Sequence, residues 1–270
     1  MRTINLSSQN NSQFFYTPNV FDYFELMKPR VMSLVVFTTV VGIYLAPYQI
    51  HPVLVLFSIL AIALGAGSAG AINQWIDREI DEVMLRTKNR PIPSGRVDPA
   101  EALTFSIVTA IISIIILGLS SNWFAAGLLF FTIFFYSVVY SIFLKHKTPQ
   151  NIVIGGAAGS LPPVIGWAAM TGDITLLPII LFMIIFLWTP PHFWALALVK
   201  SDDYKKAGIP MMPNVVGEKS TKIQILIYSI LVFTCSVTPF FLGLSGHFFI
   251  ITACCLGIVF LLLSISLIML

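Results

Sequence analysis

Charge is scarce in this chain of 270 residues, and three long stretches contain no Lys, Arg, Asp or Glu at all. They run over residues 31–76, 102–144 and 223–270. Only 10% of the residues are charged, whereas 57% are hydrophobic, a balance that excludes an ordinary water-soluble domain. A helix crosses the hydrocarbon layer of a membrane with about 20 apolar residues. The first two stretches are therefore each long enough for two crossings.

Cysteine is nearly absent as well. Cys235, Cys254 and Cys255 lie in apolar stretches without the spacing of a metal site, and no Cys-x-x-Cys-His motif for covalent haem attachment is present. Residues 1–22 are rich in Ser, Asn and Gln and lack the apolar core of a signal peptide. We therefore expect a flexible cytoplasmic tail over residues 1–22, followed by a single transmembrane domain over residues 23–270.

The hydropathy pattern predicts an all-α polytopic membrane protein, a bundle of about eight transmembrane helices with charged cytoplasmic loops. The connections on one side are only a few residues long, so consecutive helices should pack as antiparallel neighbours. The predicted spans lie near residues 31–47, 52–75, 99–119, 121–144, 150–171, 174–198, 222–243 and 247–270.

The basic residues predict the orientation of this bundle. All 15 Lys and Arg fall in the N-terminal segment or in the loops after the second, fourth and sixth spans. Because basic residues collect in short cytoplasmic loops, we expect the N-terminus and the charged loops to face the cytoplasm of a bacterium, with the chain in the inner (plasma) membrane. The net charge of +3 is then a signal of topology, and it does not indicate a nucleic-acid partner.

The first charged segment, residues 73–96, carries acidic and basic groups together. Asn73, Asp77 and Asp81 are spaced i, i+4 and i+8, so on a helix they share one face. Oxygen ligands of this kind suit Mg²⁺, which usually shares its coordination sphere with substrate phosphates. The alternative is a charged helix end that is merely solvated at the membrane surface. Three cations that could bind a diphosphate follow closely, namely Arg86, Lys88 and Arg90.

The second charged segment, residues 200–213, repeats this chemistry with other residues. Asp202 and Asp203 offer carboxylates, and the residues alone do not decide between them as metal ligands. Lys200 supplies positive charge, and the Tyr204 phenol could hydrogen bond to a phosphate. The alternative is again a solvated connector. A short basic loop containing Lys145 and Lys147 lies between the two charged segments in the sequence.

These motifs resemble those of the UbiA-type intramembrane prenyltransferases, and within that superfamily they are most similar to the branch that farnesylates haem. The similarity covers residues 22–217 best and continues less specifically to the end. The superfamily motif is Asn73-x-x-x-Asp77-x-x-x-Asp81 followed by Arg86-Thr-Lys-Asn-Arg90-Pro-Ile-Pro-Ser-Gly-Arg96. The haem branch is indicated by Lys28-Pro-Arg30, by residues 148–156, by Trp188-Thr-Pro-Pro-His-Phe-Trp194 and by Asp203-Tyr-Lys-Lys-Ala-Gly-Ile-Pro-Met-Met-Pro213.

The resemblance implies an enzyme that transfers the farnesyl group of farnesyl diphosphate to a vinyl group of haem b, giving haem O in a Mg²⁺-dependent reaction. It implies catalytic and metal-binding roles for Asn73, Asp77, Asp81 and Asp203. The diphosphate would be bound by cations and a phenol from both segments and the short basic loop, namely Arg86, Lys88, Arg90, Lys145, Lys147, Lys200 and Tyr204.

Haem contact is expected at three residues. A histidine inside a span is a candidate for function, and His192 could contact haem or simply hydrogen bond where prolines break the helix. Lys28 and Arg30 could anchor haem propionates or serve as an ordinary basic flank of the first span. Besides its two substrates, the expected partners are membrane lipids and a downstream haem-modifying enzyme or terminal oxidase.

The chain departs from the family pattern in two respects. The superfamily usually has nine spans where this chain has eight, and the second charged segment has one carboxylate fewer than in many quinone-directed relatives. Two other functions stay open. A prenyltransferase could use an aromatic acceptor such as a hydroxybenzoate, naphthoate or chlorin. A small-molecule transporter would more often place its charges at mid-membrane, not at one surface.

Overall fold

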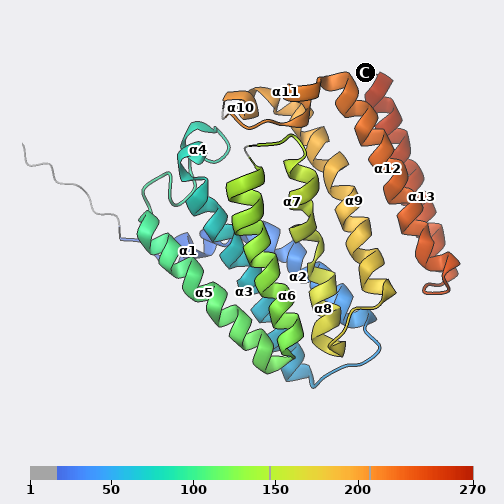
Figure 1. Cartoon of the computed structure of the whole chain (residues 1–270), viewed down its shortest axis with the longest axis horizontal. Coiled ribbons are helices and arrows are strands. Elements are labelled where there is room, and N and C mark those ends of the chain that lie inside the picture. Colours follow the sequence, from blue (N-terminus) through green and yellow to red (C-terminus); the bar gives the residue numbers. More distant parts are fainter. Residues whose placement is uncertain (1–16, 146, 207, 270) are drawn as a thin grey trace, which may run out of the picture.

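The computed structural model describes residues 17–145, 147–206 and 208–269, without the side chains of Asp202, Asp203 and Lys206. Within these residues all regular structure is helical (Figure 1). Seven described helical segments are long and apolar enough to cross a membrane, and a bent pair of helices makes up to an eighth. The predicted all-α bundle of about eight transmembrane helices is confirmed.

The helices follow one another with short connections. The first half of the chain forms α1 (Val20–Leu26), α2 (Pro29–Leu45), α3 (Pro52–Ile76), α4 (Arg78–Val83), α5 (Pro99–Ser120) and α6 (Trp123–Phe134). The last of these continues as the π-helix η1 (Phe135–Leu144). The second half forms α7 (Asn151–Ser160), α8 (Pro162–Thr171), α9 (Leu176–Val199), α10 (Ser201–Lys206), α11 (Met212–Val216), α12 (Glu218–Phe241) and α13 (His247–Met269).

Side-chain caps and prolines explain where several helices begin. The Asn19 carboxamide oxygen accepts hydrogen bonds from the backbone N–H groups of Phe21 (2.7 Å) and Asp22 (3.2 Å) and so starts α1. Asp98 caps α5 in the same way through the N–H of Ala100 (2.8 Å). Proline occupies the first turn of α2, α3 and α5, where its missing N–H leaves no helical hydrogen bond unmade.

The helix bounds agree with the predicted spans to within four residues. The largest difference is at α12, which begins at Glu218 and not near residue 222. The fifth span is broken into α7 and α8 because Pro162 lacks the N–H that an unbroken helix would use there. In contrast, α9 continues through Pro190 and Pro191.

Small residues allow α2 and α8 to pack backbone against backbone. A Cβ atom placed on Gly42 would overlap the carbonyl oxygen of Pro163, and one on Gly166 would overlap the carbonyl oxygen of Thr39. Close approach through small residues is the usual way in which helices associate in lipid, where the hydrophobic effect does not drive them together. Glycine is therefore required at both positions of this contact.

Burial differs greatly along the bundle. The α7–α8 span is central, with 72% of its most apolar stretch buried, whereas the corresponding share for α13 is 6%. In Figure 1, α12 and α13 lie at one side of the molecule. The apolar surface of α13 is what a helix in contact with lipid requires.

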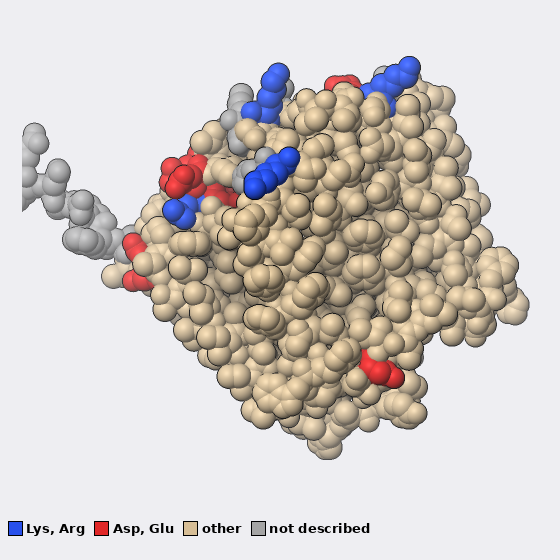
Figure 2. Space-filling view, viewed as in Figure 1, with Lys and Arg blue, Asp and Glu red and all other residues tan. Residues whose placement is uncertain are grey.

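The two charged segments lie at the same end of the bundle. Figure 1 shows α4 and the α10–α11 pair at that end. Charged side chains gather there in Figure 2, and the body of the molecule below them is uncharged apart from an acidic group near the other end. This placement agrees with the prediction that the charged loops share one side of the membrane.

Candidate active site

Asn73, Asp77 and Asp81 share one face of a helix, as predicted. The N–H of Asp77 donates to the Asn73 carbonyl (3.0 Å), and the N–H of Asp81 donates to the Asp77 carbonyl (2.8 Å). Helical hydrogen bonding therefore continues across the junction of α3 and α4 and keeps the three side chains on one face. All three are buried, with exposures of 5% for Asn73, 2% for Asp77 and 3% for Asp81. They are not a solvated helix end.

Each of these buried side chains contacts a cation from a different part of the chain. Lys145 Nζ lies 2.5 Å from Asp77 Oδ2, and Arg90 Nη1 lies 2.6 Å from Asp81 Oδ2. Lys28 Nζ donates to Asn73 Oδ1 over 2.6 Å. Burying a carboxylate is costly unless a cation compensates it, which Lys145 does for Asp77 and Arg90 does for Asp81. We call the six residues the polar face.

One oxygen of the polar face has no donor. Asp77 Oδ2 accepts from both Lys145 and Asn73 Nδ2 (2.8 Å), whereas Asp77 Oδ1 is buried without a hydrogen-bond partner. An unpartnered buried carboxylate oxygen is costly, and a divalent cation would satisfy it. Among the described side chains, no group of three His, Cys, Asp or Glu residues is gathered around one point. The donor set here is instead two carboxylates and an amide, which suits a Mg²⁺ ion that keeps substrate and water oxygens as further ligands.

A π-helix positions the partners of the polar face from the opposite side. At the end of η1 the N–H of Lys145 donates to the Tyr140 carbonyl five residues earlier (2.9 Å). Ser141 Oγ accepts from Asn73 Nδ2 (3.0 Å) while donating to a backbone carbonyl of the same helix. Asn151 Nδ2 donates to the Lys145 carbonyl (2.9 Å). π-helices are rare and frequent at functional sites. The roles of Ser141 and Asn151 were not predicted from the sequence.

Lys28 has an unusual backbone conformation. It lies between α1 and α2 with φ 53° and ψ 64°, the left-handed region that side chains with a Cβ rarely adopt. Such strain costs on the order of 1–3 kcal/mol and is found mainly where function requires it. The sequence predicted haem contact for Lys28; the structure places its ammonium group against Asn73, on the polar face.

The second charged segment approaches the first through apolar contacts. Met84 of the first segment is 3% exposed and packs in one cluster with Ile209 and Met211 of the second, with Ile80 and Tyr204 at its edge. The two segments therefore contribute side chains to the same apolar cluster. The side chains of Asp202 and Asp203 lie outside the described residues, so the metal role of Asp203 stays a prediction.

The remaining predicted cations line the outside of this end. Arg86, Lys88, Lys147 and Lys200 are exposed, and so is Arg30. Lys147 Nζ lies 5.7 Å from the centre of a phenylalanine ring, and no ion pair joins these five residues to a described acidic side chain. They add positive charge near the polar face without belonging to it.

His192 lies on α9 directly after the two prolines. Its ring stacks on Trp188 with centroids 4.3 Å apart and meets Phe193 edge-on at 5.3 Å. The side chain is exposed on the protein surface and makes no hydrogen bond to a described residue. Trp188 also lines an apolar hollow between α9, α12 and α13. An exposed imidazole against an aromatic wall is compatible with the predicted haem contact, which stays a prediction.

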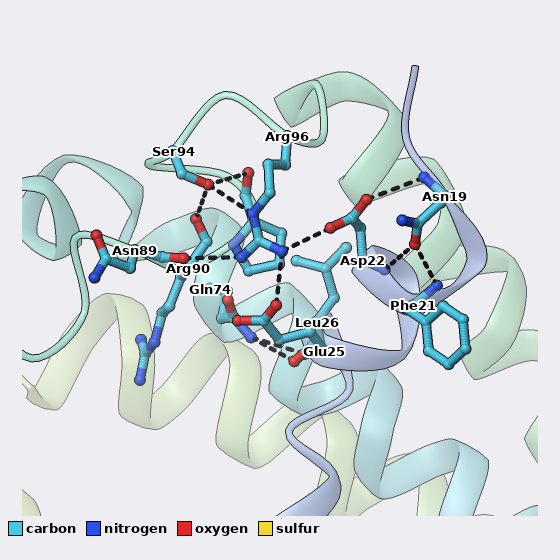
Figure 3. A network of polar contacts seen from close by, with 11 residues as sticks. Asn19, Phe21, Asp22, Glu25, Leu26, Gln74, Asn89, Arg90, Ser94 and Arg96 are labelled. Carbon is cyan, nitrogen blue, oxygen red and sulfur yellow. Dashed lines mark hydrogen bonds and ion pairs between the residues drawn. The ribbon is translucent and has the colours of Figure 1, made fainter. Parts of the chain in front are cut away.

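Arg96, for which no role was predicted, links α1 to the loop after α4 (Figure 3). Arg96 Nη1 lies 2.6 Å from Asp22 Oδ1 and 2.8 Å from Glu25 Oε2. Hydrogen bonding to Glu25 raises the pKa of the guanidinium, and the charge of Asp22 acts in the same direction. The signal in the sequence is its place at the end of the first charged segment and of the motif that resembles the prenyltransferase superfamily.

Comparison with known proteins gives a consistent result. A model of the UbiA prenyltransferase family matches residues 35–270. The chain is 60% identical over 239 residues to the protoheme IX farnesyltransferase of Agrobacterium fabrum, an alignment that covers 88% of this chain and 75% of that protein. It is 58% identical to the protein of that name from Rhizobium johnstonii, over 91% of this chain and 78% of the relative.

Solved structures with a similar fold are more distant in sequence. One described as digeranylgeranylglyceryl phosphate synthase has a TM-score of 0.77 and 20% identity, covering 92% of this chain and 86% of the other. A UbiA homologue from Archaeoglobus fulgidus, bound to DMAPP and Mg²⁺, has a TM-score of 0.69 and 15% identity, covering 91% and 85%. At these identities the likeness is one of fold.

Proposed function

Because the chain belongs to the UbiA prenyltransferase family, we propose that it transfers the farnesyl group of farnesyl diphosphate to a vinyl group of haem b, giving haem O and diphosphate. The relatives that are 56–60% identical and named protoheme IX farnesyltransferase support the choice of substrates. The observation that carries the chemistry is the buried polar face, on which two carboxylates and an amide meet three cations.

The reaction breaks the bond between the first farnesyl carbon and the diphosphate oxygen, and the electron pair leaves with diphosphate. The allylic cation is captured by a vinyl carbon of haem b. Water then adds to the resulting cation and loses a proton, which leaves a hydroxyethylfarnesyl substituent. The apolar helices around the site would limit the access of other water to the allylic cation.

The polar face would bind the leaving group. We assign Asn73, Asp77 and Asp81 as metal ligands, with the unpartnered Asp77 Oδ1 as the first oxygen available. Bound Mg²⁺ would neutralise developing charge on the diphosphate and favour its departure. Lys145 and Arg90, already beside the carboxylates, would turn N–H donors to diphosphate oxygens.

Lys28 is assigned to the same end of the substrate. Its ammonium holds the oxygen of Asn73 that a metal would use, so it would have to move aside as the metal and diphosphate enter. The ammonium would then face the diphosphate. The exposed cations Arg86, Lys88, Lys147 and Lys200 would attract the anionic substrate to this end of the bundle. Tyr204, at the edge of the contact between the charged segments, is assigned to phosphate or carboxylate hydrogen bonding.

Haem and the membrane complete the proposal. We assign His192 and its aromatic neighbours on α9 to haem, with Arg30 as a candidate for a propionate. The chain is a multi-pass membrane protein. We place it in the inner membrane of a bacterium with the charged end in the cytoplasm, because basic residues are retained on that side.

The test is a transfer assay with the purified protein in lipid vesicles. Haem b, farnesyl diphosphate and Mg²⁺ should yield haem O, identified by mass, and excess chelator should stop the conversion. Conversion that continues in chelator would contradict the metal role. Prenylation of a hydroxybenzoate, naphthoate or chlorin in place of haem would overturn the acceptor while keeping the chemistry. Absence of any prenyl transfer would overturn the proposal.

A further inference from the structure

All three guanidinium nitrogens of Arg96 donate hydrogen bonds, and together these bonds link α1 to the turn that follows α4. Besides its ion pairs with Asp22 and Glu25, Arg96 Nη2 donates to the Asn89 carbonyl (2.8 Å) and Nε donates to Ser94 Oγ (3.1 Å). We call these contacts the Arg96 network, and Figure 3 shows them converging on one guanidinium. A planar group with five donors in a fixed fork can hold four acceptors at once, which a lysine cannot do.

One side of the Arg96 network leads to Arg90. Ser94 Oγ, which accepts from Arg96, donates to the Arg90 carbonyl over 2.7 Å. The N–H of Arg96 donates to the Pro91 carbonyl (2.9 Å), so the turn is closed by backbone as well. In Figure 3 the Arg90 side chain points away from Arg96. On one side of the turn Arg90 pairs with Asp81. On the other side Arg96 pairs with the acidic residues of α1.

The other side of the Arg96 network leads to Lys28. Asp22 and Glu25 lie on α1, which ends at Leu26, two residues before Lys28. Gln74, next to Asn73 on α3, donates to the Leu26 carbonyl over 2.9 Å. Leu26 itself is fully buried in a cluster with Ala71, Ile92 and Val97. Because α1 is fixed at both ends, the strained Lys28 is held where its ammonium reaches Asn73.

We propose that Arg96 is a positioning residue of the diphosphate site, which holds α1 against the turn and thereby places Lys28 beside Asn73 and Arg90 beside Asp81. The proposal rests on the proposed function, because it takes the polar face to be the diphosphate site. Arg96 itself contacts none of Asn73, Asp77 or Asp81 in the described structure. Its effect therefore reaches the substrate only through the two cations.

The test uses Arg96→Lys, which keeps the charge and loses the fork. Arg78→Lys is the matched control, since Arg78 pairs with the exposed Glu79 and lies outside the Arg96 network. We expect Arg96→Lys to raise the KM for farnesyl diphosphate about 10-fold. The kcat and the KM for haem b should stay within about twofold of the parent, and the melting temperature should stay within a few degrees. The dissociation constant of S-farnesyl thiodiphosphate, an unreactive analogue, should rise equally in the presence of Mg²⁺. Arg78→Lys should match the parent in every measurement.

A second variant distinguishes a loss of positioning from a loss of folding. Arg96→Gln would remove a cation that pairs with the buried Asp22 carboxylate, so it is combined with Asp22→Asn, which removes that charge too. The double variant should fold and still bind the analogue about 10-fold more weakly. Binding of the analogue at the parental affinity by either Arg96 variant overturns the proposal. So does an equal rise in both KM values with a lowered melting temperature, which indicates a purely structural role.

The proposed function and the positioning role of Arg96 are tested separately. If the parent transfers no farnesyl group to haem but binds the analogue, the proposed function is wrong, and the affinities of the Arg96 variants still decide the positioning role. If the parent binds no analogue in the presence of Mg²⁺, both are wrong.

Discussion

The two charged segments have similar compositions and are built differently. In the first, the buried side chains of Asn73, Asp77 and Asp81 each contact a half-buried cation over 2.5–2.6 Å, and two of these cations come from other parts of the chain. In the second, the described residues that make contact are apolar, and Lys200 is exposed. The charged contacts therefore belong to the first segment, and the second segment packs with it in the apolar cluster that contains Met84, Ile209 and Met211. Similar composition does not imply similar structure, because burial decides whether a charge is paired or solvated.

The largest effect is expected for Asp77→Asn, a change of nearly equal shape in the first segment. It removes the negative charge and the oxygen that lacks a donor, so we expect transfer activity to fall by roughly 10²–10³-fold. Farnesyl transfer to haem in vesicles measures it. Asp173→Asn, the same change in an exposed loop at the opposite end of the bundle, should alter activity by less than about twofold. Near-parental activity in Asp77→Asn would contradict the role of the polar face.

A second change removes a cation from the first segment's partners. Lys145→Met should destabilise the protein by about 3 kcal/mol, because it leaves the Asp77 carboxylate with a buried charge and one neutral donor. Thermal unfolding with purified protein measures the loss. Added Mg²⁺ should restore part of it by taking the place of the ammonium. Unchanged stability with and without Mg²⁺ would show that the pair is solvated.

The apolar contact between the segments is tested by Met84→Ala. Removing a buried methionine costs about 2 kcal/mol at the low end of the range for such sites. Leu85→Ala, the neighbouring residue at 71% exposure, should cost less than about 0.5 kcal/mol. Denaturant unfolding of both variants gives the difference. Equal effects would mean that the second segment does not rest on the first.

The smallest effect is expected for the exposed cations. Lys88→Ala should change the KM for farnesyl diphosphate by less than about threefold at physiological salt and more at low salt, because exposed charges act at long range and are screened. Initial rates at two ionic strengths measure this. An effect as large as that of Asp77→Asn would place Lys88 on the polar face.

The spans, and the shared helix face of Asn73, Asp77 and Asp81, were predictable from the sequence for physical reasons. Long uncharged stretches leave few alternatives to membrane helices, and the i, i+4, i+8 spacing needs only a helix to align three side chains. The sequence could not predict that Lys28 contacts Asn73, because a left-handed residue between two helices has no local signature when it is not glycine. The Arg96 network was equally hidden, since it joins residues more than 70 positions apart.

The wide turns of η1 have a consequence for how this chain can change in length. Because Lys145 follows a run of hydrogen bonds that span five residues, its register depends on the number of residues in that run. Deleting a single residue there would favour an ordinary α-helix and turn the ammonium group by about 100° around the axis. The span could still cross the bilayer, yet its cation would face away from Asp77. An insertion or deletion in this helix can therefore leave the span apolar and long enough for the bilayer and still turn Lys145 away from Asp77.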